Sequence, residues 1–199
     1  MECFPADATV DVFNVGKVPL SSLEIGALVR VVDATNQIRH SPVIAFLHRD
    51  LNEQALYRRV RTKTAVIELS QRHLIHQRRD GFVWAEKLRV GDEILVVQTD
   101  SDDQTQWEEI LIISDVHKQG LMAPLTDQGT IVVNNVHASC YALVKTHQLG
   151  HMALAPYRWY RRFFGSLSDG QNSTTPILSY ANVLLHFFKS VPIAKDLIF

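Results

Sequence analysis

The sequence predicts a mainly β protein built from two similar halves, with a helical segment appended at its carboxyl end. Three observations support this: apolar strand patterns fill residues 1–142, the pattern of residues 23–31 returns at residues 88–96, and helical spacing begins only near the end. The chain has 199 residues, 46% apolar and 21% charged, which is the composition of a folded globular protein. We therefore expect a domain of residues 1–142 and a helical region of residues 143–199.

Composition and charge exclude several classes of protein. Twenty basic and 21 acidic residues give a net charge of −1, which argues against a general nucleic-acid binder. No apolar run reaches the roughly 18 residues of a membrane-spanning helix, and the first seven residues lack the pattern of a secretory signal. Two cysteines, Cys3 and Cys140, permit at most one internal disulfide and do not define a redox compartment. An enzyme and a binding module both remain open.

An internal repeat is the strongest sign of the architecture. Residues 23–31 (LEIGALVRV) return as residues 88–96 (LRVGDEILV), and each copy is a Leu-x-x-Gly turn that opens an apolar strand. A second pair, residues 64–70 and 130–136, shares a threonine followed by β-branched residues at nearly the same offset. Two such pairs predict a duplicated, pseudo-twofold β domain.

The other strands follow from alternation and from apolar runs. Val10 and Val12 alternate with polar residues, and residues 43–47 form a continuous apolar run. We expect residues 110–113 to form a strand that is buried on both faces. Turns and loops are predicted at residues 14–16, 80–81, 100–103 and 127–129.

The carboxyl-terminal region has a different pattern. A polar linker over residues 166–175 leads to Thr175-Pro176, a typical helix start, and apolar residues then follow at helical spacing until Pro192. Residues 157–164 interleave aromatic and arginine side chains, which suits an interface with lipid or an apolar ligand. The alternative is that both segments simply pack on the β domain.

Three residues could carry chemistry on a peptide bond. Cys3 is placed to attack the bond that precedes it, although it could also be a stray or packed terminal thiol. Ser70 and His73 lie three residues apart at a strand end, so they converge only if the chain turns there. His73 could protonate an amide nitrogen as it leaves, and Ser70 could orient that amide or its oxyanion. A surface serine and histidine would give the same pattern.

Two further positions have both a functional and a structural interpretation. His48 and Asp50 share one face of a strand, as a base and its orienting group or as two solvated side chains. Cys140 ends the last predicted strand, where a small core residue is equally suitable. The nine histidines lack metal-ligand spacing with cysteine or carboxylate, so we expect no metal site.

The ordered combination of these motifs resembles the Hedgehog autoprocessing domain, over nearly the whole chain. The matching segments are CFP at 3–5, the two Leu-x-x-Gly turns, Ser-x-x-His at 70–73, FLHRD at 46–50, GTIVVN at 129–134, SCYA at 139–142, LGH at 149–151, LAP at 154–156 and, more faintly, YAN at 180–182.

The resemblance implies a Hint fold, shared with inteins and built from two pseudosymmetric halves. It implies Cys3 as the nucleophile of a thioester-forming step and His73 as the group that assists it. Ser70 stands where the family usually has threonine, and Cys140 matches a second cysteine able to exchange thiols or form a disulfide with the nucleophile. His48 occupies the position of an aspartate that acts as base for a sterol hydroxyl. An imidazole has an ordinary pKa near 6.5 and can take that role.

The implied reaction transfers the segment before Cys3 to cholesterol, with residues 143–199 as the sterol-recognition region. Nematode Hedgehog-related proteins vary at the base position, so the acceptor need not be cholesterol. Glu2 precedes Cys3 where Hedgehogs have glycine, and with only Met1 before it we expect an excised fragment. No His-Asn pair closes the domain as in splicing inteins, so we expect cleavage or transfer.

The expected partners follow from the same resemblance. They are the chain's own amino-terminal cargo and a sterol, with membrane association through residues 143–199. We expect a monomer in the secretory pathway, with no cofactor and no nucleic acid. Two alternatives remain: a Hint domain whose thioester goes to water or another small nucleophile, and a lipid-binding module without chemistry.

Overall fold

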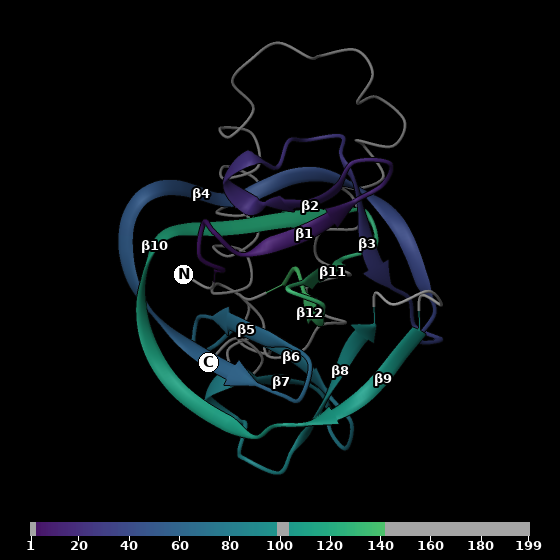
Figure 1. Cartoon of the computed structure of the whole chain (residues 1–199). Coiled ribbons are helices and arrows are strands. Elements are labelled where there is room, and N and C mark those ends of the chain that lie inside the picture. Colours follow the sequence, from purple (N-terminus) through teal and green to yellow (C-terminus); the bar gives the residue numbers. More distant parts are fainter. Residues whose placement is uncertain (1–2, 99–103, 142–199) are drawn as a thin grey trace, which may run out of the picture.

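A computed structural model describes residues 3–98 and 104–141, and these residues are mostly β-strand (Figure 1). The described strands form two six-stranded sheets whose pairings are antiparallel. The linker and helix expected beyond residue 142 lie outside the described residues. Within the described ranges, no helix is long and apolar enough to cross a membrane.

The first half of the described chain contains five strands and one short 3-10 helix. They are β1 (Thr9–Val12), β2 (Gly16–Pro19), η1 (Leu20–Ser22), β3 (Leu28–Val32), β4 (Ile38–Arg61) and β5 (Val66–Leu69).

The second half repeats this order, except that two strands, β9 and β10, stand where the first half has the single long strand β4. It contains β6 (Leu74–Gln77), β7 (Gly81–Trp84), η2 (Ala85–Lys87), β8 (Glu93–Gln98), β9 (Gln104–Glu109), β10 (Ile112–Thr126), β11 (Thr130–Val133) and β12 (Val136–Ser139).

The predicted duplication is confirmed element by element. β6, β7, η2 and β8 follow β1, β2, η1 and β3 in the same order and at one constant sequence offset, which is that of the two Leu-x-x-Gly turns. Gly26 and Gly91, the glycines of these turns, both have a φ of 93°, a conformation that side chains rarely adopt. The repeated sequence therefore encodes the same turn and the same strand in each half.

Two long strands connect the halves. β4 and β10 pair antiparallel from Arg61 with Ile112 to Val43 with Thr126, with three irregularities in the register. In Figure 1 they run side by side in one long arc, with β11 and β12 near the middle of the molecule. The apolar side chains enclosed by this arc form the main core, which draws residues from both halves.

The segment at residues 110–113 corrects one expectation. Ile110 is fully buried, but Leu111 and Ile112 are 49% and 52% exposed, so the prediction of a strand buried on both faces is wrong. Here the chain leaves β9 and begins β10: the Ile110 N–H donates to the Asp92 carbonyl, and the Leu111 N–H donates to the Arg61 carbonyl. The segment changes partners at this point, so Leu111 and Ile112 are exposed while Ile110 is buried and Ile113 packs against the core.

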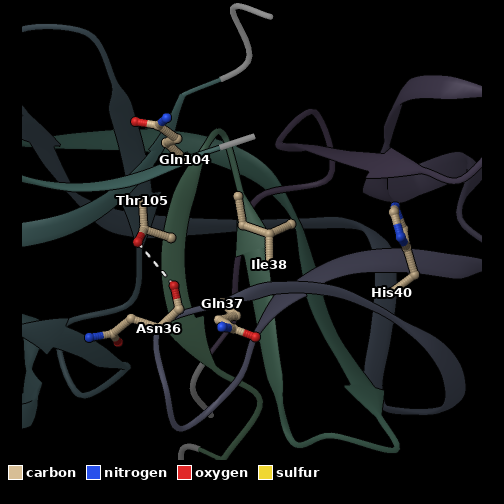
Figure 2. Close-up of a pocket in the computed structure, with 6 residues that line it drawn as sticks. All are labelled: Asn36, Gln37, Ile38, His40, Gln104 and Thr105. Carbon is tan, nitrogen blue, oxygen red and sulfur yellow. Dashed lines mark hydrogen bonds between the residues drawn. The ribbon is translucent and has the colours of Figure 1, made fainter. Parts of the chain in front are cut away.

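A pocket lies where the turn after β3 approaches the start of β9. Figure 2 shows its lining residues, and the Thr105 hydroxyl donates to the Asn36 carbonyl at 3.0 Å across it. The pocket is lined by Asn36, Gln37, Ile38, His40, Gln104 and Thr105.

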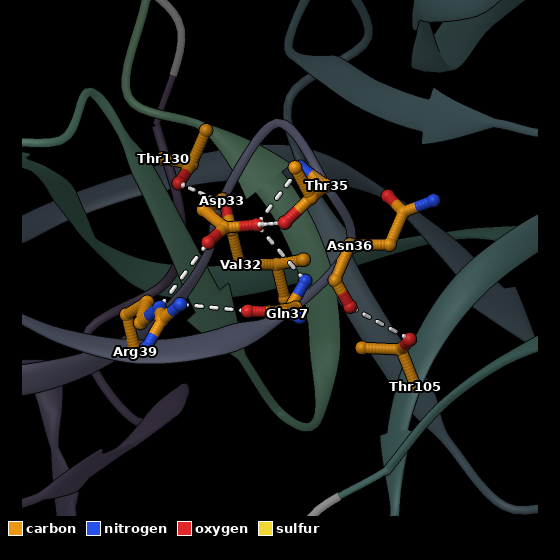
Figure 3. A network of polar contacts seen from close by, with 8 residues as sticks. All are labelled: Val32, Asp33, Thr35, Asn36, Gln37, Arg39, Thr105 and Thr130. Atoms are coloured by element: carbon orange, nitrogen blue, oxygen red, sulfur yellow. Dashed lines mark hydrogen bonds and ion pairs between the residues drawn. The ribbon is translucent and has the colours of Figure 1, made fainter.

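The same turn is held by a carboxylate. Asp33 Oδ1 accepts the backbone N–H groups of Thr35 and Gln37 at 2.8 and 3.0 Å (Figure 3). The hydrogen bond from the Thr35 hydroxyl is the main reason that the pKa of Asp33 lies well below its usual range. The Thr130 hydroxyl donates to the Val32 carbonyl at 2.9 Å, which ties β11 to the strand before this turn.

Candidate active site

Cys3 is fully buried, although chain ends are usually exposed. The reason is its neighbour Phe4, which pairs with Met122 of β10 through two backbone hydrogen bonds of 2.8 and 2.9 Å. This pairing draws the amino-terminal segment onto the sheet. Cys3 then packs in a small apolar cluster with Tyr57, Leu121 and Ala123.

Ser70 holds both polar backbone groups of Cys3. The Cys3 N–H donates to Ser70 Oγ at 2.6 Å, while the Ser70 N–H and hydroxyl donate to the Cys3 carbonyl at 3.0 and 3.2 Å. The chain turns directly after Ser70, because the His73 N–H donates to the Ser70 carbonyl at 3.0 Å. The turn on which the Ser-x-x-His interpretation depended is therefore present.

His73 is a buried, neutral base. Its Nε2 lies 2.9 Å from the Ser139 carbonyl, which can only accept, so Nε2 carries the proton. Nδ1 is buried and makes no hydrogen bond within the described residues. Burial lowers the pKa of His73 to about 4, although the hydrogen bond to Ser139 opposes this shift. At neutral pH the imidazole is therefore uncharged.

The ring of His73 faces the segment that carries Cys3. It packs against Phe4, with ring centroids 4.2 Å apart. Cys3, Ser70 and His73 therefore belong to one centre, where the amino-terminal segment meets the turn between β5 and β6. Because the imidazole is neutral, it cannot supply a proton to a leaving amide until it has first received one.

His48 of β4 lies opposite a residue that packs with Cys3. It pairs with Ala123 across β4 and β10, and Ala123 belongs to the apolar cluster of Cys3. Residues directly opposite in antiparallel strands point to the same face. His48 is half-buried, and its Nε2 is buried with no hydrogen-bond partner among the described residues.

Asp50 shares this face with His48 but has partners of its own. Its carboxylate accepts the backbone N–H groups of Asn52 and Glu53 at 2.8 and 3.2 Å. These two bonds, more than the nearby His48, hold the pKa of Asp50 below its usual value. Asp50 thus fixes the local backbone of β4, and no hydrogen bond from it to His48 occurs in the described structure.

Cys140 lies at the edge of the centre. It is buried in the main core, which also contains Phe4, and its Sγ is 3.7 Å from the Thr126 hydroxyl. Ala138 pairs with Ile75, so β12 runs antiparallel to β6 and Cys140 lies at the same end of the strand pair as His73. Cys140 therefore lies in the packed core, at the end of β12 that is next to His73.

Two residues of the centre were not expected from the sequence. The Tyr57 hydroxyl, fully buried, donates to the Phe4 carbonyl at 3.3 Å and to the Gly120 carbonyl. Burial and the adjacent Cys3 raise the pKa of Tyr57. Gly120 has a φ of 89°, and a Cβ there would lie 2.9 Å from the Ala6 nitrogen. A glycine inside a strand indicates that another backbone approaches closely, so the sequence did contain a signal for Gly120. Tyrosine is common in strands, so the sequence contained no such signal for Tyr57.

The described residues offer little to a metal ion. They contain no cluster of three histidine, cysteine, aspartate or glutamate side chains suited to holding one. The pocket of Figure 2 shares no residue with the centre around Cys3.

The fold defines the class of protein. The architecture is similar to that of the Ssp DnaB mini-intein variant M86, with a TM-score of 0.61 and 14% identity over 69% of this chain and 92% of the intein. It is also similar to a bacterial intein-like domain from Clostridium thermocellum, with a TM-score of 0.58 and 18% identity over 70% of this chain and 99% of that domain. The fold is the Hint fold.

The sequence identifies the family. The Hint module model matches residues 1–192, and the chain belongs to that family. The chain is 32% identical to the Hedgehog protein of Drosophila erecta over 162 residues, 78% of this chain and 35% of the fly protein. It is 32% identical to that of Drosophila virilis over 186 residues, 87% and 38% of the two chains. The chain thus spans somewhat more than a third of these relatives.

Proposed function

We propose that this chain is a self-cleaving domain that transfers the segment before Cys3, its cargo, to a sterol hydroxyl. The hydrogen bond from the Cys3 nitrogen to Ser70, beside the neutral imidazole of His73, is the observation that supports this most directly. The Hint fold and the similarity to Hedgehog proteins support autoprocessing in general. Cholesterol as acceptor rests on that similarity alone.

The first step exchanges an amide for a thioester. The Cys3 thiol gives its proton to His73 Nδ1 as sulfur bonds to the carbonyl carbon that precedes it. The carbon–nitrogen bond then breaks, and Nδ1 passes the same proton to the Cys3 nitrogen, which becomes an amine. A base with a pKa of about 4 takes a thiol proton reluctantly but returns it readily, so the transfer favours departure of the nitrogen.

The second step consumes the thioester. In our proposal His48 takes the proton of the sterol hydroxyl as its oxygen attacks the thioester carbonyl. The Cys3 sulfur leaves as a thiolate and the cargo is released as a sterol ester. The Nε2 of His48 is buried and has no hydrogen-bond partner among the described residues, which supports this role. In this proposal residues 143–199 present the sterol and associate with a membrane. The chain acts as a monomer in the secretory pathway.

A reporter protein fused before Cys3 tests the proposal. Incubation with dithiothreitol should release the reporter as a thiol adduct, and incubation with cholesterol should release it as a cholesteryl ester, separated by mass spectrometry. A free carboxylate in both cases would instead assign the thioester to water. No cleavage under any condition would leave only the lipid-binding alternative.

Substitution of His48 separates the two steps. We expect H48A to cleave with dithiothreitol at the wild-type rate and to lose transfer to cholesterol by about 10²- to 10⁴-fold, the contribution of a positioned base. H48D should keep part of the transfer, because a carboxylate can also accept the proton. Wild-type sterol transfer by H48A would contradict this assignment.

A further inference from the structure

One buried hydroxyl beside the nucleophile takes part in neither proposed step. Tyr57 of β4 is fully buried, and its side chain packs in the same small apolar cluster as Cys3. Its hydroxyl donates to the Phe4 carbonyl at 3.3 Å and to the Gly120 carbonyl. A phenol has a single proton, so the two carbonyls share it. The ring of Tyr57 therefore supports the side chain of Cys3, while the hydroxyl binds backbone oxygens.

The two carbonyls belong to segments that are distant along the chain. Phe4 is in the amino-terminal segment, and Gly120 is in β10, at a point where the register of β10 with β4 is irregular. Such an irregularity leaves a residue out of the regular pairing. Two buried carbonyl oxygens that face one position need a donor there, because each would otherwise lose hydrogen bonding. The Tyr57 hydroxyl is that donor, and it joins the amino-terminal segment to β10.

This hydroxyl adds a third support to the backbone that carries the nucleophile. Ser70 binds the N–H and the carbonyl of Cys3, and Met122 pairs with Phe4 through two backbone hydrogen bonds. Tyr57 holds the Phe4 carbonyl from β4. The backbone of Cys3 and Phe4 is thus fixed by the turn after β5, by β10 and by β4. With the backbone fixed, the position of the sulfur depends on a single side-chain torsion.

The hydroxyl remains a donor when a thiol ionises. Burial is the main reason that the pKa of Tyr57 is raised, and the nearby Cys3 raises this pKa further. The phenol therefore keeps its proton through the pH range in which a thiol of ordinary pKa, about 8.5, becomes a thiolate. A negative charge on the nucleophile does not remove the hydrogen bonds that hold its backbone.

We propose that Tyr57 is a positioning residue for thioester formation, and that its hydroxyl acts by fixing the backbone that carries the Cys3 thiol. The proposal rests on the proposed function and deepens it, because it names a further residue on which the first step depends. Reacting atoms must be held in close alignment, and a displacement of about 1 Å lowers a rate by about 100-fold.

The Y57F variant tests this proposal, because it keeps the ring and removes the hydroxyl. The rate of cleavage of the reporter fusion is measured against the concentration of dithiothreitol. At saturation each thioester is captured as it forms, so the plateau is the rate of thioester formation. We expect the plateau of Y57F to be about 10- to 100-fold lower than that of the wild type. Thermal unfolding identifies a temperature at which both proteins are folded.

The T130V variant is the matched control. The Thr130 hydroxyl is also buried and also donates to a backbone carbonyl, that of Val32 at 2.9 Å, but it ties β11 to β3 (Figure 3). We expect T130V to lose thermal stability and to keep the plateau of the wild type. If Y57F likewise kept the wild-type plateau, the positioning role of Tyr57 would be overturned while the proposed cleavage remained intact.

A stabilising osmolyte separates positioning from folding. Trimethylamine N-oxide favours the compact state and supplies no hydrogen-bond donor at residue 57. If Y57F is partly unfolded, recovery of the wild-type plateau in this osmolyte would show that the hydroxyl only stabilises the fold. A plateau that stays low in the refolded variant would support positioning. Failure of every fusion to cleave, wild type included, would overturn the proposed function and the role of Tyr57 together.

Discussion

Ser70 supports the nucleophile through its backbone as well as its side chain. Its N–H binds the Cys3 carbonyl whatever the side chain, whereas the two hydrogen bonds of Oγ, to the Cys3 nitrogen and to the Cys3 carbonyl, depend on the hydroxyl. This explains why serine can stand where related domains are expected to have threonine. The hydroxyl remains, and the missing methyl takes no part in any of these hydrogen bonds.

Removing that hydroxyl should slow thioester formation. S70A leaves the Cys3 N–H without its acceptor, which costs about 1–3 kcal/mol and corresponds to roughly a 5- to 160-fold lower rate. The measurement is dithiothreitol cleavage of the reporter fusion, with thermal unfolding as a check on the fold. S70T should retain most of the rate, and equal losses in both variants would show that the hydroxyl is not responsible.

Burial of His73 also makes stability depend on pH. Its pKa is about 4 in the folded protein, below the ordinary value near 6.5, so the unfolded chain binds the proton more readily. The contribution of this residue is therefore fully present above pH 6.5 and is lost as the pH falls toward 4. The slope from one such group approaches about 1.4 kcal/mol per pH unit.

Urea unfolding between pH 7 and pH 4 measures this slope. H73Q keeps an N–H donor for the Ser139 carbonyl but cannot titrate, so its unfolding free energy should fall less steeply with acid than that of the wild type. His76, whose pKa is also lowered by burial, is present in both proteins and cancels in the difference. Parallel curves would contradict a depressed pKa at His73.

The segment of residues 3–6 is the element that brings Cys3 into the candidate site. Phe4 pairs with Met122, and the Ala6 N–H donates to the Gln119 carbonyl at 3.0 Å, so the segment lies along β10 on either side of Gly120. The register of β10 with β4 is irregular between Gln119 and Leu121. A bulge here lets the backbone of Ala6 approach where a side chain would otherwise stand.

A methyl group at Gly120 should therefore displace the nucleophile. G120A places a Cβ against the backbone of Ala6, which cannot move away as a flexible side chain would. We expect about 2–4 kcal/mol of destabilisation from overlap and left-handed strain together, and a strong loss of cleavage. G81A is the control: its φ is 72°, but a Cβ there meets nothing within 4 Å. The G81A variant should lose about 1–2 kcal/mol of its free energy of unfolding and should still cleave.

At the scale of the molecule, the two halves supply equivalent parts of the centre. The Leu20 N–H donates to the Ala8 carbonyl, and at the corresponding place in the second half the Ala85 N–H donates to the His73 carbonyl. The segment that carries Cys3 and the turn that carries Ser70 and His73 thus occupy matching positions in the two repeats. The centre forms where these matching segments meet.

The predicted division of the chain gives a test at this scale. A reporter fusion that ends at residue 142 should fold and cleave with dithiothreitol like the full chain, because the Cys3 centre is built from residues before that point. Transfer to cholesterol should be lost, since residues 143–199 are expected to present the sterol. Sterol transfer by the shortened fusion would place the acceptor site within the β domain.

Local sequence patterns predicted much of this fold. The Leu-x-x-Gly turns and the alternation at Val10 and Val12 depend on neighbouring residues, and the structure confirms them. The prediction that residues 110–113 are buried on both faces was wrong, because burial depends on which strands cover each face. Likewise, the sequence could not predict the hydrogen bonds of the Tyr57 hydroxyl, because its partners at Phe4 and Gly120 are both distant from it along the chain.

By itself the sequence determined the duplicated β architecture and the candidates Cys3, Ser70, His73, His48 and Cys140, because residue types and short spacings carry that information. The tertiary structure decided that Cys3 is buried, that its nitrogen binds Ser70, and that His73 is a neutral base. Burial, protonation and proximity are set by contacts between distant segments. Those contacts exist only once β10, the amino-terminal segment and the turn before β6 have come together.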